Sequence, residues 1–171
     1  MNPTNLMYDA SVPVFKQLLS SLNTILDKTQ IHMNEHPAQS ATLLQASLYP
    51  DMFHFIRQVQ IATDFAKGVT ARLAGLEVPV FDDLETNISE LKKRIDKTLL
   101  FIATIKPEQI NGSENKEIIT RPGTPKEKRF NGKSYLLHYG IPQFFFHITT
   151  AYGILRSNGV EIGKKDYMGE Y

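Results

Sequence analysis

Histidine is the residue type with the widest chemical reach in this chain, because the sequence contains no cysteine. The five histidines are His32, His36, His54, His138 and His147. A neutral imidazole can bind a divalent metal or exchange a proton near neutral pH. The lack of cysteine excludes disulfides, thiolate zinc sites, iron–sulfur clusters and cysteine nucleophiles. The search for metal or acid–base chemistry therefore begins with these histidines.

The segment His32–His36 has the spacing H-x-x-E-H, which is the pattern of a reversed zinc metalloprotease motif. That mechanism needs both imidazoles on one face of a rigid helix, with Glu35 beside a metal-bound water. Pro37 follows immediately and pushes the preceding residue out of the helical region, so the helix must end here. We interpret the motif as a solvated helix end, where the helix dipole favours histidine.

His147 is a stronger candidate because it lies in the most apolar predicted helix, with Gln143 one turn earlier on the same face. A neutral imidazole at a bundle centre can bind a metal when a second helix supplies another ligand. His54, which has Gln58 one turn after it, is the candidate partner. The alternative is a core histidine that donates to a carbonyl or hydroxyl. The residues alone favour that alternative, because one histidine and one glutamine do not make a transition-metal site.

Other patterns have simpler interpretations. Asp82-Asp83 is typical of a helix start, and Asp64 with Lys67 is typical of a surface pair three residues apart. The sequence has no nucleophile elbow and no glycine-rich phosphate loop. The basic run 126–129 (KEKR) is interpreted as a solvated loop.

Length and composition indicate one soluble domain over residues 1–171. Hydrophobic residues make up 42% of the 171 residues, charged residues 22%, and the formal net charge is +1. These values are typical of a globular domain. The balanced charge argues against nucleic-acid binding, which needs an excess of Lys and Arg. The first residues lack the pattern of a signal peptide, and no apolar run approaches the ~18 residues of a membrane span. We expect a cytoplasmic protein.

Four segments have the apolar spacing of amphipathic helices. The predicted helices run from Tyr8 to before Pro37, from Pro50 to Gly75, from Asp82-Asp83 to Pro107, and from Pro142 to Asn158-Gly159. Residues 37–47 are predicted to form a loop or broken turn. The solvated face of the third helix is expected to carry Lys92, Lys93, Arg94, Asp96 and Lys97. The tail, residues 160–171, is expected to pack back on the bundle.

The helical period is lost between the third and fourth helices. Residues 117–120 and 128–130 are predicted to pair as two short strands around a turn at 121–125, with a second turn at Asn131-Gly132. The predicted fold class is therefore all-α, a four-helix bundle with a small irregular or hairpin insertion before the last helix. Burying about 25 apolar side chains at ~1.5–3 kcal/mol each is enough to offset chain ordering, so folding needs no metal.

Three stretches carry a resemblance to a known family: residues 48–52 (LYPDM), residues 58–68 (QVQIA and AKG), and residues 142–169. The most specific part is 146–152 (FHITTAY). With these motifs the chain resembles the family called domain of unknown function 1993, over essentially its whole length. That family is similar to the wider DinB-like (DinB/YfiT-like) group of four-helix bundles.

The resemblance implies a candidate metal site. Many DinB-like proteins hold a divalent metal through three histidines, one in the second helix and two in an H-x-x-x-H arrangement in the last. His147 matches the second position of that pair, but Gln143 stands at the first. His54, or with less support Gln58, is the available second-helix ligand. Glutamine is a poor donor for zinc, nickel or iron, so the implied site of His54, Gln143 and His147 would bind such a metal weakly.

These observations support one leading hypothesis and two alternatives. The leading hypothesis is a small-molecule binding or interaction protein with a degenerate metal pocket, forming a homodimer through helix faces. The first alternative is a metal-dependent transferase or hydrolase, with its site between the second and fourth helices; some members of the wider group are thiol S-transferases or metal-dependent isomerases. The second alternative is a stress-related or DNA-damage accessory factor, although the balanced charge opposes direct DNA contact. Whether the protein is an enzyme stays open.

Overall fold

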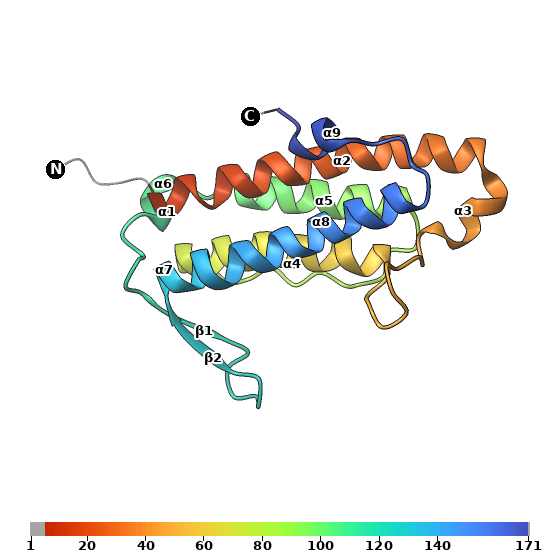
Figure 1. Cartoon of the computed structure of the whole chain (residues 1–171). Coiled ribbons are helices and arrows are strands. Elements are labelled where there is room, and N and C mark those ends of the chain that lie inside the picture. The colour runs from red at the N-terminus through yellow and green to blue at the C-terminus, as the bar shows by residue number, and fades with distance from the viewer. Residues whose placement is uncertain (1–5, 171) are drawn as a thin grey trace.

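The computed structural model describes residues 6–170, apart from the side chains of residues 39 and 41. Most of these residues are helical, and one short hairpin extends away from the helices (Figure 1). The helices are α1 Leu6–Asp9, α2 Val12–Glu35, α3 Pro37–Leu43, α4 Phe55–Ala74, α5 Ile88–Ala103, α6 Pro107–Ile110, α7 Gly132–Ser134, the π-helix η1 Tyr135–Gly140, α8 Ile141–Ser157 and α9 Lys164–Met168; the strands are β1 Glu117–Thr120 and β2 Lys128–Asn131.

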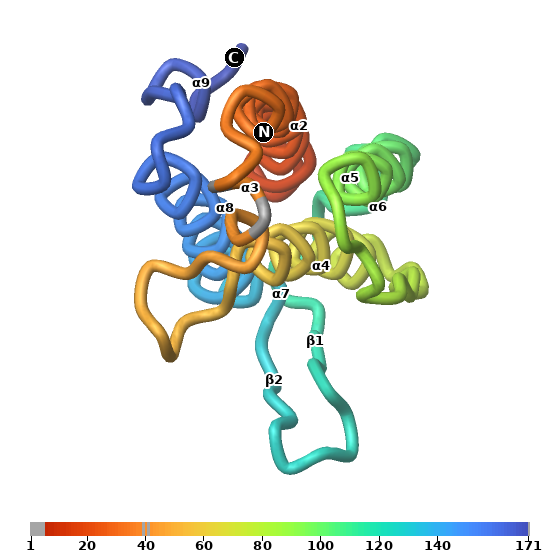
Figure 2. Tube along the Cα trace, turned by 90° about the vertical axis from the view of Figure 1, so that its right-hand side faces the viewer, coloured from red at the N-terminus to blue at the C-terminus, as the bar shows by residue number. Residues whose placement is uncertain are grey.

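The four long helices α2, α4, α5 and α8 form a bundle around one apolar core (Figure 2). Helix α4 packs against both α5 and α8, and α2 closes the ring on the opposite side. Phe15 of α2 and Phe144 of α8 meet edge to face in this core, with ring centroids 4.8 Å apart. The predicted all-α four-helix bundle is confirmed.

The start of α4 was predicted wrongly. Pro50 and Asp51 lie in a turn, and the helix begins only at Phe55, after the N-cap residue His54. The first backbone N–H groups of a helix have no partner within the helix. His54 Nδ1 accepts a hydrogen bond from one of them, the Arg57 backbone N–H, so the helix begins after His54 and not at Pro50. Residues 37–47 also differ from the prediction, because Pro37 starts the short helix α3, where its fixed backbone angle is suitable.

The start of α5 was likewise predicted too early. Asn87, rather than Asp82-Asp83, is the N-cap, and its side chain accepts the Glu90 N–H at 3.0 Å. The acidic pair lies in the linker between α4 and α5. Leu84, which the predicted helix would include, lies in this linker and is 76% exposed. Asparagine is among the strongest N-cap residues, so it decides where the helix begins.

The hairpin forms where it was predicted. Strands β1 and β2 pair antiparallel, with Ile118 opposite Phe130 and Thr120 opposite Lys128. The predicted turn at Asn131-Gly132 is wrong, because the Asn131 side chain caps α7 through the Ser134 N–H at 2.8 Å. The chain then runs through α7 and η1 directly into α8, so helical structure begins well before Pro142.

The tail packs back on α2 as expected, within the described residues. Gln17 Nε2 donates to the Met168 carbonyl at 2.9 Å, and Lys28 forms an ion pair with Asp166 at 2.7 Å. Tyr171 lies outside the described residues. Among residues 6–170 there is no helix with the length and apolar character needed to cross a membrane. The cytoplasmic location stays a prediction.

Candidate functional site

A cavity of about 490 Å³ lies between α4, the junction of η1 with α8, and the hairpin. We call it the His147 cavity. Its walls combine aromatic and aliphatic side chains with several cationic ones. The lining residues are Phe53, Arg57, Ile61, Asp64, Phe65, Val69, Arg72, Thr120, Arg121, Lys128, Tyr135, Tyr139, Gln143 and His147.

His147 is the buried polar group of this cavity, with 7% of its surface exposed. Its Nδ1 lies 2.7 Å from Gln58 Oε1. The amide nitrogen of Gln58 donates to the Phe53 carbonyl at 2.9 Å, which fixes the amide orientation and leaves Oε1 as an acceptor. His147 must therefore donate from Nδ1, and in the neutral ring Nε2 holds a free lone pair.

The imidazole is held neutral and rigid. Burial, together with the nearby positive charge of Arg57, lowers the pKa of His147 from 6.5 to about 4. Phe65 stacks on the ring at a centroid distance of 6.0 Å, and Phe146 meets it edge-on at 5.2 Å. At neutral pH the Nε2 atom of His147 is therefore held in place as a hydrogen-bond acceptor or as a metal-binding nitrogen.

One wall of the cavity is built by the π-helix η1. Tyr135 and Tyr139 project from it into the lining, with ring centroids 5.9 Å apart, and Phe65 meets Tyr139 edge-on at 5.8 Å. Gly140 lets η1 approach α4 closely, because a Cβ there would lie 2.6 Å from Val69 Cγ2. π-Helical turns are rare and frequently occur at functional sites.

The charges of the cavity are not balanced. Its described lining includes four cations and one carboxylate, Asp64, which is already paired with Lys67 and Arg94 at 2.9 and 2.8 Å. Arg57 pairs with Asp83 of the α4–α5 linker. The remaining three cations, Arg72, Arg121 and Lys128, form no ion pair with any residue between 6 and 170.

The structure brings two of the three predicted ligands together. Gln143 and His147 both line the cavity, whereas His54 does not line it and uses Nδ1 to cap α4. Gln58, weighed as the weaker alternative to His54, is the residue that contacts His147, but its oxygen already accepts the imidazole N–H. Metal binding itself stays a prediction.

The donor set does not fit a divalent metal well. No group of three or more His, Asp or Glu side chains is placed to hold a metal ion anywhere in the part of the chain that the structure describes. His147 offers a single nitrogen, and a neutral amide is a weak second donor. The four cations that line the same cavity also oppose a positively charged ligand.

The H-x-x-E-H segment lies at a helix end, as interpreted from the sequence. Glu35 is the last residue of α2, and His36 falls between α2 and α3 with its side chain exposed. The rings of His32 and His36 are 4.7 Å apart, tilted against each other at the surface. The two imidazoles therefore do not lie on a rigid, buried helix face.

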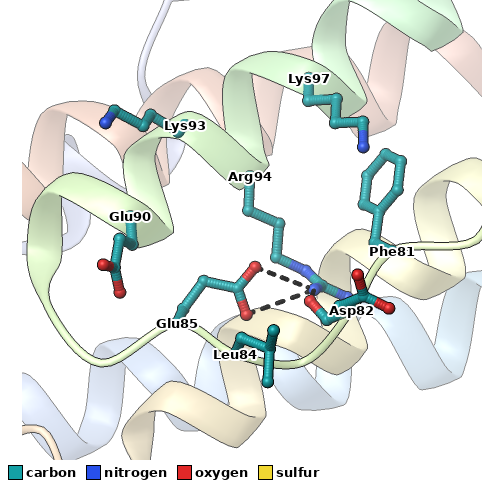
Figure 3. Close-up of a pocket in the computed structure, with 8 residues that line it drawn as sticks. All are labelled: Phe81, Asp82, Leu84, Glu85, Glu90, Lys93, Arg94 and Lys97. Carbon is teal, nitrogen blue, oxygen red and sulfur yellow. Dashed lines mark hydrogen bonds and ion pairs between the residues drawn. The ribbon is translucent and has the colours of Figure 1, made fainter.

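A second cavity, of about 350 Å³, lies beside Arg94 between α5 and the α4–α5 linker (Figure 3). Arg94 was predicted to face solvent and is only 3% exposed. Its guanidinium contacts Asp64, Asp83 and Glu85 at 2.8–3.1 Å, and Nε donates to Thr63 Oγ1 at 2.7 Å. We call these five residues the Arg94 cluster. The linker carboxylates fold over α5 and draw the arginine inward, so the prediction fails there.

Several lining residues were missed by the sequence reasoning. Arg57, Arg72 and Arg121 carried no motif, and Lys128 was interpreted as part of a solvated loop. Lys128 is indeed exposed, but the hairpin directs it to the cavity. One signal for these residues was available in the sequence. Residues seven or eight apart share one helix face, so Arg57, Gln58 and Phe65 of α4 are expected to lie on the same side of the helix.

The bundle, its inserted hairpin and the last-helix histidine define a DinB-like four-helix bundle. The fold is similar to the crystal structure of a DinB family member protein from Shewanella denitrificans, with a TM-score of 0.89 and 39% identity over 97% of this chain and 93% of that chain. The model of the family described as domain of unknown function (DUF1993) matches residues 7–168, and the chain belongs to this family. Comparison with curated proteins finds no match.

Proposed function

We propose that this protein binds a small molecule in the His147 cavity and that the metal pocket of the wider group is degenerate here. The observation that carries the proposal is a buried, neutral imidazole with a fixed tautomer on the wall of a ligand-sized cavity. Pockets for small molecules are typically ~300–1,000 Å³, mostly apolar, with a few fixed polar groups. The His147 cavity has a volume in this range, and its walls combine aromatic and aliphatic side chains with several polar and charged ones.

A purely structural role explains less of this geometry. A core histidine is usually packed on all sides with both ring nitrogens satisfied. His147 satisfies Nδ1 through Gln58, while the ring lines a cavity shared with the polar side chain of Gln143. The π-helix that supplies Tyr135 and Tyr139 is a further local departure from regular structure at the same place.

The proposal can be tested by a fragment screen in which cavity access is blocked. Ile61 lines the cavity from α4, so Ile61→Trp fills part of it. Leu100→Trp adds the same bulk at an exposed position on α5 and is the matched control. We expect fragments that raise the melting temperature of the wild type and of Leu100→Trp, but not of Ile61→Trp. Fragment hits that are equally strong in all three proteins would contradict the proposal.

The metal-dependent transferase or hydrolase is the competing function, and the donor set gives it less support than small-molecule binding has. We expect purified protein dialysed against buffer to hold zinc, nickel and iron well below one equivalent, because His147 has no second imidazole beside it. The measurement is elemental analysis of the wild type and of His147→Ala. Stoichiometric metal that disappears in His147→Ala would contradict the degenerate metal pocket and support the competing function.

We also propose a homodimer through helix faces. Exposed apolar side chains lie on α8 and on the loop before α4, where Leu48 approaches the α8 backbone at Gly153. These side chains are Leu48, Tyr49, Phe53 and Phe146. Light scattering coupled to size exclusion should give twice the chain mass for the wild type and a lower mass for Phe146→Glu. A monomer at all concentrations would exclude the dimer.

A further inference from the structure

The charges of the His147 cavity point beyond a generic small molecule. Within residues 6–170, Arg72, Arg121 and Lys128 have no carboxylate partner, although all three line the same cavity. Of the other two cations in residues 117–131, Arg129 contacts both Glu117 and Glu127, whereas Lys126 has no ion pair among the described residues and does not line the cavity. Three cations without a carboxylate partner thus line one cavity, and they attract an anion into it.

Two of these cations belong to the hairpin. Lys128 is paired in register with Thr120, and Arg121 follows Thr120 directly. Arg121 has a backbone φ of 51°, the left-handed region that a residue with a long side chain rarely adopts. Residues held in that region tend to be found at ligand and active sites. Arg121 and Lys128 both line the cavity from the hairpin.

The inner walls indicate the shape of the ligand body. Phe65, Tyr135 and Tyr139 present aromatic rings, and Ile61 and Val69 add aliphatic surface. The Lys128 ammonium lies 5.4 Å from the centroid of the Tyr139 ring, so charge and aromatic surface meet at one end. Aromatic groups of a ligand pack well between such rings, in offset or edge-on arrangements.

We infer that the ligand of the His147 cavity is a small aromatic anion, with a carboxylate or phosphate group bound by Arg121 and Lys128 and an aromatic body against Phe65 and Tyr139. This inference rests on the proposed function of the cavity. A guanidinium recognises carboxylate and phosphate oxygens through two parallel hydrogen bonds, and an ammonium adds a point charge. Arg72 is a third cation in the lining and is half-buried. Its guanidinium donates to the Tyr135 hydroxyl at 3.1 Å.

His147 offers a further contact to the ligand. Its Nε2 is an acceptor, so a hydroxyl or N–H group on the aromatic body would donate to it. The Gln143 amide, which lines the same cavity, can satisfy either a donor or an acceptor. An anion alone would leave these groups without a partner from the ligand.

The test compares charged and neutral aromatic probes of one size by titration calorimetry. The probes are 1-naphthyl phosphate, 2-naphthoate and the neutral 2-naphthamide. We expect both anions to bind at least about tenfold more tightly than the amide at low salt, and the difference to shrink when salt is raised.

The double variant Arg121→Gln/Lys128→Gln should lose about tenfold or more in affinity for both anions. The matched control Lys126→Gln removes a charge from the same hairpin outside the cavity and should bind like the wild type.

The outcomes separate this inference from the proposed function. If 2-naphthamide binds as tightly as the anions and Ile61→Trp abolishes all binding, the cavity binds small molecules but the anion inference is wrong. If neither anion binds, the inference is also wrong, and the fragment screen decides the proposed function. If a short single-stranded oligonucleotide displaces 1-naphthyl phosphate at lower concentration than naphthoate does, the anion belongs to a polymer and the small-ligand inference fails.

Discussion

The Arg94 cluster and the His147 cavity contain the same kinds of side chain and differ in how the charges are matched. Arg94 is buried among Asp64, Asp83 and Glu85, and each side of its guanidinium has a partner. In the His147 cavity the cations of the hairpin face open space without carboxylates among the described residues. A matched set of charges holds the polypeptide together, whereas an unmatched set is available to a ligand.

The aromatic rings follow the same division. Phe81 lines the cavity beside Arg94, which we call the Arg94 groove. The Lys67 and Lys97 ammonium groups lie over its ring, at 4.7 and 4.1 Å from the ring centroid. The Phe65 and Tyr139 rings of the other cavity contact further rings and line an accessible volume. The charged and aromatic groups beside Arg94 therefore have partners within the protein. We expect substitutions beside Arg94 to lower stability and substitutions in the His147 cavity to weaken ligand binding.

The largest expected effect comes from Arg94→Met, which removes the charge that three carboxylates share. We expect the free energy of unfolding to fall by about 2–4 kcal/mol, because the linker loses its main attachment to α5 and the carboxylates repel one another. Arg121→Met is the matched control in the other region and should change stability by less than about 0.5 kcal/mol. Urea denaturation followed by circular dichroism measures both. Equal losses would remove the distinction between the two regions.

The next effect is a pH dependence that belongs to His147. Its pKa is about 4 in the folded protein and near 6.5 when unfolded, so between these values the unfolded state binds the extra proton. The contribution of His147 to the free energy of unfolding is fully present above pH 6.5 and is lost as the pH falls toward 4. The loss is about 2–3 kcal/mol at pH 4.5. Urea denaturation at pH 7 and pH 4.5 should show this loss in the wild type but not in His147→Gln.

His138→Gln serves as the control for that measurement, because His138 is exposed on η1. It should keep the wild-type pH dependence, since carboxylates titrate equally in both proteins. An unchanged pH dependence in His147→Gln would mean that the buried imidazole does not resist protonation, and the contrast with the solvent-exposed histidine would disappear.

The smallest expected effect concerns the strained backbone of the hairpin. Asparagine enters the left-handed region more readily than arginine, so Arg121→Asn should leave stability unchanged or raise it by up to about 0.5 kcal/mol. The same substitution should weaken binding of 1-naphthyl phosphate. A clear loss of stability would instead assign Arg121 a structural role like that of Arg94.

The sequence was sufficient for elements whose signals are local. The apolar stripes identified the four long helices, and the loss of the helical period with the turn residues at 121–125 identified the hairpin. The starts of α4 and α5 were missed because several capping signals compete within a few residues, and the side-chain bonds of His54 and Asn87 decide between them. Such choices depend on hydrogen bonds that spacing does not encode.

The candidate site was predictable only at its centre. His147 and Gln143 stood out by residue type and helical spacing, and both line the cavity. The cations come from α4 and from a hairpin whose orientation depends on tertiary packing, so their convergence could not be deduced from local patterns. The π-helix η1 was equally hidden, because it lies in the stretch before Pro142 where the helical period is lost, and a π-helical turn has no local sequence signature.

The most direct test of the account is a crystal structure of the protein soaked with 1-naphthyl phosphate, because it asks which of the two regions takes the anion. The account predicts the naphthyl ring in the His147 cavity, with the phosphate in hydrogen-bond contact with Arg121 and Lys128 and no ligand in the Arg94 groove. Density for the ligand beside Phe81, Lys93 and Lys97, with the His147 cavity unchanged, would contradict it.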